Sequence, residues 1–157
     1  MIYFFRIPPG MGEDYELYCN LVKRLKLKNV IFEGWQSPKA YYENAKIFLM
    51  TSRYEGWGMT IVEAQQMGCI PIVMDTFKAL HDIVLDGENG FIVEDNDIDH
   101  MADVIRYLVY NPIKMSEIAL KSSISTHRFS IDNIGKKWLE LYSKVAEDTE
   151  FKSNCKL

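Results

Sequence analysis

The sequence predicts an α/β fold, a Rossmann-like three-layer sandwich around a mainly parallel sheet. Short apolar segments of strand length alternate with helical patterns of about 10–15 residues, which is the order of parallel β-α-β units. The strand segments are apolar throughout rather than alternating, as strands covered on both faces are. Ligands of such sheets bind beyond the carboxyl ends of the strands. The loops that begin at Gly34, Ser52 and Asp75 are therefore expected to carry function.

The first third of the chain predicts two strands and two helices. An apolar and aromatic run predicts a strand at residues 2–6, closed by the turn sequence Pro8-Pro9-Gly10. A helix follows at residues 15–27, where leucines recur on one face. A second strand is predicted at residues 29–32. A serine N-cap followed by proline then opens a helix at residues 38–45.

The middle of the chain contains the most regular β-α-β pattern. Residues 46–51 predict a strand, and residues 59–67 predict a helix that Gly68 ends. Residues 70–74 then form a wholly apolar strand segment. This order predicts a parallel pair of strands joined by one crossover helix.

The last third predicts one strand and three helices. The turn sequence at residues 86–90 precedes a short strand at residues 91–93. Helical patterns follow at residues 97–110, 113–125 and 132–147. We expect residues 1–147 to form one domain and residues 148–157 to fray as a tail, because periodicity is lost there.

Composition narrows the class of protein. The chain has 157 residues, 48% of them hydrophobic, with a net charge of -4 and no Lys/Arg-rich stretch, which argues against nucleic acid as the main partner. Its apolar runs are too short to span a membrane, and the start of the chain has no signal-peptide pattern. Three cysteines without metal-like spacing favour a reducing compartment. We therefore expect a cytoplasmic setting.

One loop and the helix after it stand out as a candidate anion site. Gly56 and Gly58 let the backbone approach a ligand closely or adopt a positive φ. The amides of Gly58, Met59 and Thr60 then face outward from a helix N-terminus, where phosphate groups bind well. A glycine turn before a helix is also an ordinary turn, so both interpretations stay open at this point.

Two glutamates flank that helix start. Glu55 lies in the loop, and Glu63 lies inside the helix between Val62 and Ala64. A carboxylate in an apolar run is costly to bury unless it has a hydrogen-bonding partner. Glutamate near a helix N-terminus is also favoured by the helix dipole, so a structural role remains an alternative for both.

The segment EGWGMTIVEAQQMGCIPIV, which holds Glu55 and Glu63 with seven residues between them, resembles the signature of the group-1 retaining glycosyltransferases of GT-B type. The resemblance continues in residues 29–35 and 45–52 upstream and in residues 81–93 and 129–142 downstream. It implies the C-terminal half of a GT-B architecture. Members transfer a sugar from a nucleoside-diphosphate sugar to a glycan or lipid-linked acceptor.

The resemblance assigns roles to particular residues. Glu55, the catalytic residue, is expected to accept hydrogen bonds from donor-sugar hydroxyls, and Glu63 is expected to hold the ribose. The donor-binding backbone is expected at Gly56, Trp57, Gly58, Met59 and Thr60, with Gly34 and Trp35 near the base. No metal and no other cofactor is implied.

Two parts of the family pattern are absent. The chain is too short to hold the N-terminal acceptor domain, and it lacks the strand and helix that carry a Gly-Arg…Lys-Gly element near the donor diphosphate. In a strand order of 3-2-1-4-5-6 the absent strand is central. Either the strand at residues 2–6 takes its place, or a partner chain or a second copy completes the sheet.

Positive charge for the diphosphate has several candidate sources. Arg6 is one alternative to the absent arginine, although a strand-end arginine is normally a surface residue. Arg53, Lys78 and His81 lie in or near the loops after strands, and each also fits an ordinary surface role. His100 and His127 are interpreted as structural.

Two functions are therefore open. The first is a donor-binding domain that is inactive without its acceptor domain and that, in the full-length protein, works at the inner face of the membrane. The second is a non-catalytic nucleotide-sugar-binding or interaction module that kept the fold. A Rossmann dehydrogenase is excluded because no G-x-G-x-x-G motif follows the first strand.

Overall fold

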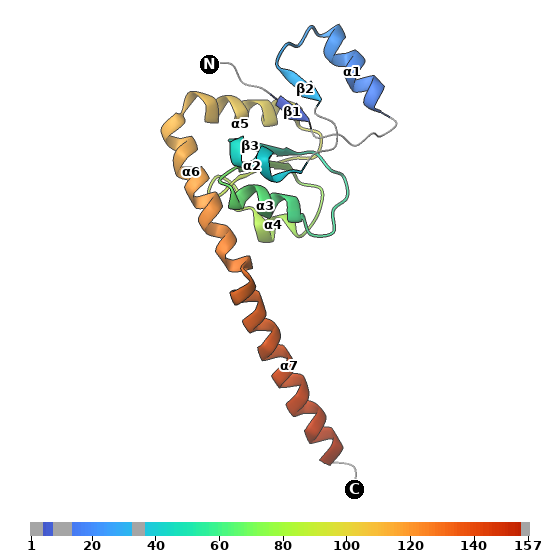
Figure 1. Ribbon diagram of the computed structural model, residues 1–157, viewed down its shortest axis with the longest axis vertical. Helices are drawn as coiled ribbons and strands as arrows, with labels where there is room; N and C mark the ends of the chain where they lie inside the picture. The colour runs from blue at the N-terminus through green and yellow to red at the C-terminus, as the bar shows by residue number, and fades with distance from the viewer. Residues whose placement is uncertain (1–4, 8–13, 33–36, 155–157) are drawn as a thin grey trace. The chain divides into compact units, whose positions relative to one another are not determined.

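The computed structural model describes residues 5–7, 14–32 and 37–154, in which the predicted α/β class is confirmed (Figure 1). The chain divides into two compact units, residues 1–41 and residues 42–157. The five predicted strands are all present. They lie in two parallel sheets, β1-β2 in the first unit and β3-β4-β5 in the second.

The first unit is a single β-α-β element. β1 (Phe5–Ile7) pairs in parallel with β2 (Val30–Phe32), and α1 (Tyr15–Arg24) connects them. The Tyr15 ring meets the Phe32 ring edge-on at 5.6 Å between centroids, which holds the start of α1 against the end of β2. α1 ends at Arg24, before the end predicted from its leucine pattern, and Lys26 adopts a positive φ of 52° just after it.

The second unit is built on a buried three-stranded sheet. β3 (Ile47–Met50), β4 (Ile70–Met74) and β5 (Phe91–Val93) are parallel, with β4 in the middle. Every residue of β4 is buried, as expected for a strand covered on both faces. α2 (Lys39–Asn44) precedes this sheet in sequence, at the boundary of the two units.

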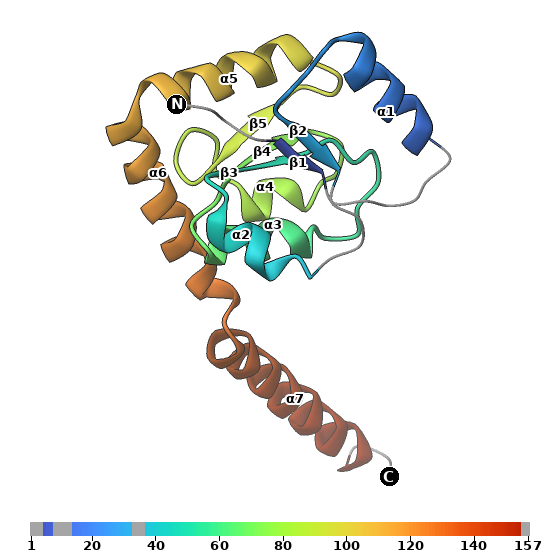
Figure 2. The same ribbon diagram turned by 45° about the horizontal axis from the view of Figure 1, so that its top comes forward.

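Helices lie on both sides of this sheet (Figure 2), and a hydrophobic cluster packs between the sheet and the helices on each side. On one face, Ile70 and Ile72 of β4 pack with residues of α5 (Ile98–Tyr110) and α6 (Pro112–Ser125). On the other face, Val73 of β4 packs with residues of α3 (Met59–Gln66) and α4 (Leu80–Ile83). This is the predicted helix–sheet–helix sandwich.

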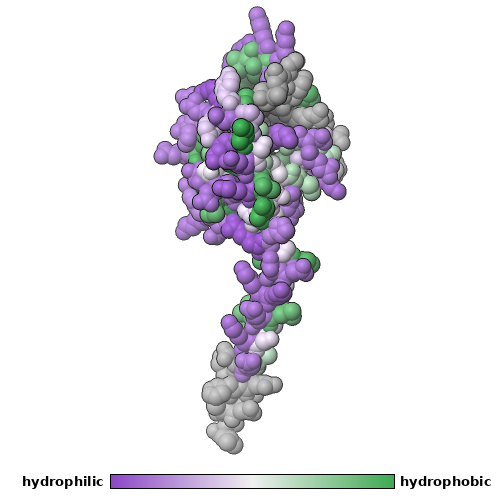
Figure 3. Space-filling model, turned by 90° about the vertical axis from the view of Figure 1, so that its left-hand side faces the viewer, coloured by the Kyte–Doolittle hydropathy of each residue, from purple (hydrophilic) through white to green (hydrophobic). Residues whose placement is uncertain are grey.

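The chain then leaves the sheet through a short helix and a long one. The 3-10 helix η1 (Thr126–Phe129) follows α6 and leads to α7 (Ile131–Asn154). α7 continues beyond residue 147, where the sequence pattern predicts its end, and it runs away from the sheet (Figures 1 and 2). Its side chains include exposed Trp138, Leu139 and Tyr142. In Figure 3, hydrophobic side chains form small separate groups on a mainly hydrophilic face.

Candidate functional site

The carboxyl ends of the three central strands place three loops together. Residues 51–58 follow β3, residues 75–79 follow β4, and residues 94–97 follow β5. The Thr76 hydroxyl donates to the backbone oxygen of Ser52 at 2.6 Å, which ties the first two loops. The Asp75 amide donates to the Val93 oxygen at 2.8 Å, which ties the second loop to β5. The loops predicted from Ser52 and Asp75 therefore share one edge of the sheet.

Gly58 forms the N-cap of α3 in a left-handed conformation, with φ 91° and ψ 44°. A side chain there would also be crowded, because a Cβ would lie 3.1 Å from both Ile61 Cδ1 and Phe77 Cζ. The Ile61 amide closes the first turn on the Gly58 oxygen at 3.0 Å. The amides of Met59 and Thr60 precede it in the first turn, so the helix offers them no partner. Both residues are exposed. Two of the three residues of the predicted anion-binding helix start are thus exposed to solvent, whereas Gly58 is buried.

Glu55 and Glu63 lie on either side of this helix start, and both are half-buried. Within the described residues neither carboxylate has a hydrogen bond or an ion pair, so both can accept hydrogen bonds from a ligand. The negative charge of Glu63 reaches Tyr42, where burial first and this charge second raise the pKa of the tyrosine above its ordinary value.

The deeply buried polar residue of α3 is Gln65, which sequence reasoning did not single out. Its side chain is fully buried, and Nε2 donates to the Asn89 backbone oxygen at 3.2 Å. Asn89 in turn accepts from the Leu85 amide and donates to the Ile83 oxygen. A polar residue two positions after Glu63 in an apolar helix was the available signal. This network fixes α3 against the turn at residues 86–90.

Trp57 is held by packing. Its indole meets the Phe129 ring edge-on, with 4.9 Å between centroids and 90° between planes, and it lies against the cluster around α3 and α4. The neighbouring Gly56 is exposed, and a Cβ there would meet nothing within 4 Å. The indole thus has a packing partner, while the backbone beside it remains accessible.

The candidate cations differ in whether they have a partner. Arg53 and Lys78 are exposed and have no partner in the part of the chain that is described. His81 Nε2 lies 3.0 Å from Asp75 Oδ1, and both side chains are exposed. His81 is therefore paired with the Asp75 carboxylate at the carboxyl end of β4.

Comparison with known families decides the class. The family described as glycosyl transferases group 1 matches residues 9–122. The chain belongs to this family. Among its relatives, a poly(ribitol-phosphate) α-N-acetylglucosaminyltransferase of Staphylococcus aureus is 30% identical over 137 residues, which is 85% of this chain and 28% of the relative. The chain thus spans less than a third of that relative's length.

Solved structures of glycosyltransferases have the same fold. TarM of S. aureus, in a complex with Fondaparinux, α-GlcNAc-glycerol and UDP, matches with a TM-score of 0.79 and 29% identity, over 88% of this chain and 29% of TarM. Anabaena HepE in complex with UDP-glucose matches at 0.73 and 25%, over 85% and 38%. The C-terminal domain of the group 1 protein LpcC from Francisella tularensis matches at 0.68 and 25%, over 77% and 66%.

Some positions expected from the family lie outside the described residues. These are Gly34 and Trp35, expected near the base. The side chain of Arg6, the alternative to the absent arginine, also lies outside them. Among the described residues of this glycosyl transferase chain, no three His, Cys, Asp or Glu side chains gather as a metal site would need. No helix in the described ranges is both long enough and apolar enough to cross a bilayer.

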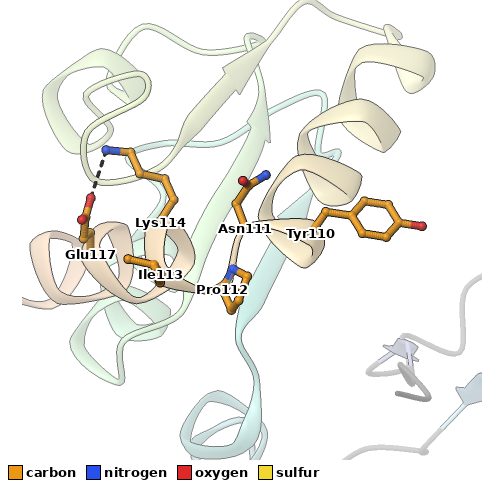
Figure 4. Close-up of a pocket in the computed structure, with 6 residues that line it drawn as sticks. All are labelled: Tyr110, Asn111, Pro112, Ile113, Lys114 and Glu117. Carbon is orange, nitrogen blue, oxygen red and sulfur yellow. Dashed lines mark hydrogen bonds and ion pairs between the residues drawn. The ribbon is translucent and has the colours of Figure 1, made fainter.

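A surface hollow of about 480 Å³ lies at the corner between α5 and α6 (Figure 4). Its lining includes Asn111, Ile113 and the ion pair between Lys114 Nζ and Glu117 Oε2, 3.0 Å apart, while the Tyr110 ring points away from that pair. α5 begins just after the carboxyl end of β5, and the hollow lies at the other end of α5. No residue of the three loops lines it, so it is separate from the candidate site.

Proposed function

We propose that this chain is the donor-binding domain of a retaining glycosyltransferase and that its donor is a UDP-sugar. The proposal rests on family membership and on the UDP and UDP-glucose present in the TarM and HepE complexes. The retaining outcome follows from the resemblance of the segment around Glu55 and Glu63 to the signature of retaining members.

The observation that carries the proposal is the N-terminus of α3, where Met59 and Thr60 are exposed and where Glu55 and Glu63 have no hydrogen-bond or ion-pair partner among the described residues. In the proposed complex, amides at Gly58, Met59 and Thr60 bind the diphosphate, because a helix N-terminus attracts negative charge. Glu63 accepts hydrogen bonds from the two ribose hydroxyls, and Glu55 accepts hydrogen bonds from hydroxyls of the donor sugar. Backbone amides that already point at the diphosphate stabilise the negative charge that develops on it as the bond to the sugar breaks.

The acceptor side of the reaction is also part of the proposal. The chain spans 28% of the S. aureus relative, and the resemblance assigns the acceptor to an N-terminal domain. We propose that this chain binds the donor and not the acceptor, and that transfer to a glycan or lipid-linked acceptor requires the N-terminal domain.

Thermal and urea unfolding with UDP, GDP, ADP, UDP-glucose and UDP-N-acetylglucosamine tests the donor. A ligand at 100 times its dissociation constant stabilises a protein by about 2.7 kcal/mol. We expect this for UDP and the UDP-sugars, and a much smaller effect for GDP and ADP. Stabilisation by all three nucleotides alike, or by none, contradicts the proposal.

Two variants test the assigned roles. Glu63→Gln should weaken the binding of UDP and of UDP-sugars equally, because it changes the group that accepts hydrogen bonds from the ribose. Glu55→Gln should weaken the binding of UDP-sugars and leave the binding of UDP unchanged. Glu88→Gln is the matched control, because Glu88 is exposed in the turn before β5, away from the three loops. Equal effects of Glu55→Gln on UDP and UDP-sugar would refute its role toward the sugar.

A further inference from the structure

The loop that carries Glu55 is short of internal restraints. Residues 51–58 contain Gly56 and Gly58, which give the backbone wide conformational freedom. Besides the packing of Trp57 against the cluster around α3 and α4, two side-chain interactions link this loop to the rest of the unit in the described ranges. One is the hydrogen bond from Thr76 to the Ser52 oxygen at 2.6 Å. The other is the edge-on contact of the Trp57 and Phe129 rings at 4.9 Å. The second contact is made by the residue two positions after Glu55.

Phe129 is distant in sequence and is itself firmly held. Arg128 Nη2 donates to the Ile83 oxygen of α4 at 2.9 Å, and the guanidinium carbon lies 4.6 Å from the centroid of the Phe129 ring. The Asn133 side-chain amide of α7 donates to the His127 oxygen at 2.7 Å. Buried Thr126 donates to the Ser123 oxygen of α6, also at 2.7 Å. The end of η1 is thus fixed by α4, α6 and α7.

We propose that Phe129 is a positioning residue for donor binding, acting through Trp57 to hold residues 51–58 in the ligand-ready conformation. The Trp57 ring is the side chain through which Phe129 reaches the loop between Glu55 and Gly58. A loop that is already ordered pays no ordering cost when the ligand binds. This inference rests on the proposed donor site, and it adds a residue that lies more than sixty positions away in the chain.

The first test needs no ligand. Backbone ¹⁵N order parameters are near 0.85 for rigid amides and below about 0.6 for flexible ones. We expect the amides of residues 53–58 to be rigid in the wild-type chain and to fall below about 0.6 in Phe129→Leu. Phe91→Leu is the matched control, because Phe91 is also half-buried and contacts one ring, that of Tyr107, in the other hydrophobic cluster. It should leave the loop rigid.

The second test is UDP affinity by titration calorimetry. We expect Phe129→Leu to weaken UDP about tenfold, Phe91→Leu to leave it unchanged, and Phe129→Tyr, which keeps a ring, to retain both affinity and loop order. If Phe129→Leu does not fold, Phe129→Met tests the same contact with an unbranched apolar side chain and should loosen the same amides.

The outcomes separate this inference from the proposed function. If the wild-type chain does not bind UDP, the donor proposal fails, while the order parameters still decide whether Phe129 holds the loop. If UDP binds and Phe129→Leu or Phe129→Met leaves both loop order and affinity unchanged, the positioning role is overturned. Equal loosening in Phe91→Leu would also overturn it, because the effect would then be a general loss of stability.

Discussion

The Thr76 hydroxyl lies 2.6 Å from the backbone oxygen of Ser52, so a side-chain hydrogen bond joins the loops after β4 and β3. The same hydroxyl lies 3.4 Å from the Met74 oxygen, at the end of its own strand. The edge of the sheet at which the two glutamates lie is therefore held by a residue of the neighbouring loop.

Removal of this hydroxyl should loosen the edge. Thr76→Val keeps the side-chain shape and leaves the Ser52 oxygen without its donor, so we expect a loss of about 1 kcal/mol in the free energy of unfolding. Urea unfolding measures this loss. Thr51→Val is the control in the first loop, because Thr51 is exposed, and it should change stability by less than about 0.5 kcal/mol. Equal stabilities of the two variants would exclude a restraining role for Thr76.

The two glycines of the candidate site should respond differently to alanine. Gly58→Ala places a Cβ at φ 91° and 3.1 Å from Ile61 Cδ1, so we expect a loss of about 1–3 kcal/mol. Gly56→Ala meets nothing within 4 Å and should be nearly neutral for folding. Thermal unfolding of both variants measures the difference. A neutral Gly58→Ala would show that the left-handed N-cap of α3 is not required.

Much of this architecture is predictable from local sequence. β4 and α3 are found within a residue of their predicted ends, because an uninterrupted apolar run and a terminal glycine mark them clearly. α4 has only four residues, so its sequence cannot show a repeating helical pattern. η1 lies in the gap between two predicted helices. The division into two sheets depends on long-range pairing, which local patterns do not encode.

The candidate site shows the same limit. The spacing of Glu55 and Glu63 and the glycine at the helix start are visible in the sequence, and the structure places them at one edge. The partners are not visible: nothing local pairs Thr76 with Ser52 or Phe129 with Trp57, because these contacts join residues far apart in the chain. Glu63 is half-buried, whereas Gln65, two positions later in α3, is fully buried, and no local pattern distinguishes the two.

Gln65 and Asn89 should therefore differ in importance although they contact each other. The Asn89 side chain accepts from the Leu85 amide at 2.7 Å and donates to the Ile83 oxygen at 3.1 Å. The Ile83 oxygen keeps its bond from Arg128 in Asn89→Ala, so this variant loses two hydrogen bonds and leaves the Leu85 amide unpaired, and we expect a cost of about 2 kcal/mol. Gln65→Met loses one hydrogen bond and also removes Oε1, a buried oxygen with no partner among the described residues, so we expect a change below about 1 kcal/mol.

Urea unfolding of both variants, with a double mutant, tests this difference. The effects of the two substitutions should add, because Gln65 donates to the Asn89 backbone oxygen, which Asn89→Ala keeps. A larger loss for Gln65→Met than for Asn89→Ala would mean that the Gln65 amide, rather than the Asn89 turn, anchors α3.

The buried thiol of Cys69 should make stability fall at high pH. Burial raises the pKa of Cys69 from 9.0 to about 11, against a smaller opposite effect of Lys46, and Sγ donates to the Tyr42 oxygen at 3.2 Å. Because the folded state keeps its proton longer than the unfolded state, the stabilising contribution is complete below about pH 9 and is lost as pH rises toward 11. Two pKa units correspond to roughly 3 kcal/mol.

Urea unfolding at pH 8 and pH 10.5 should show a larger loss in the free energy of unfolding for the wild type than for Cys69→Ala, with Cys19→Ala as the thiol control. Parallel losses in all three chains would show that the thiol at Cys69 does not set the alkaline limit.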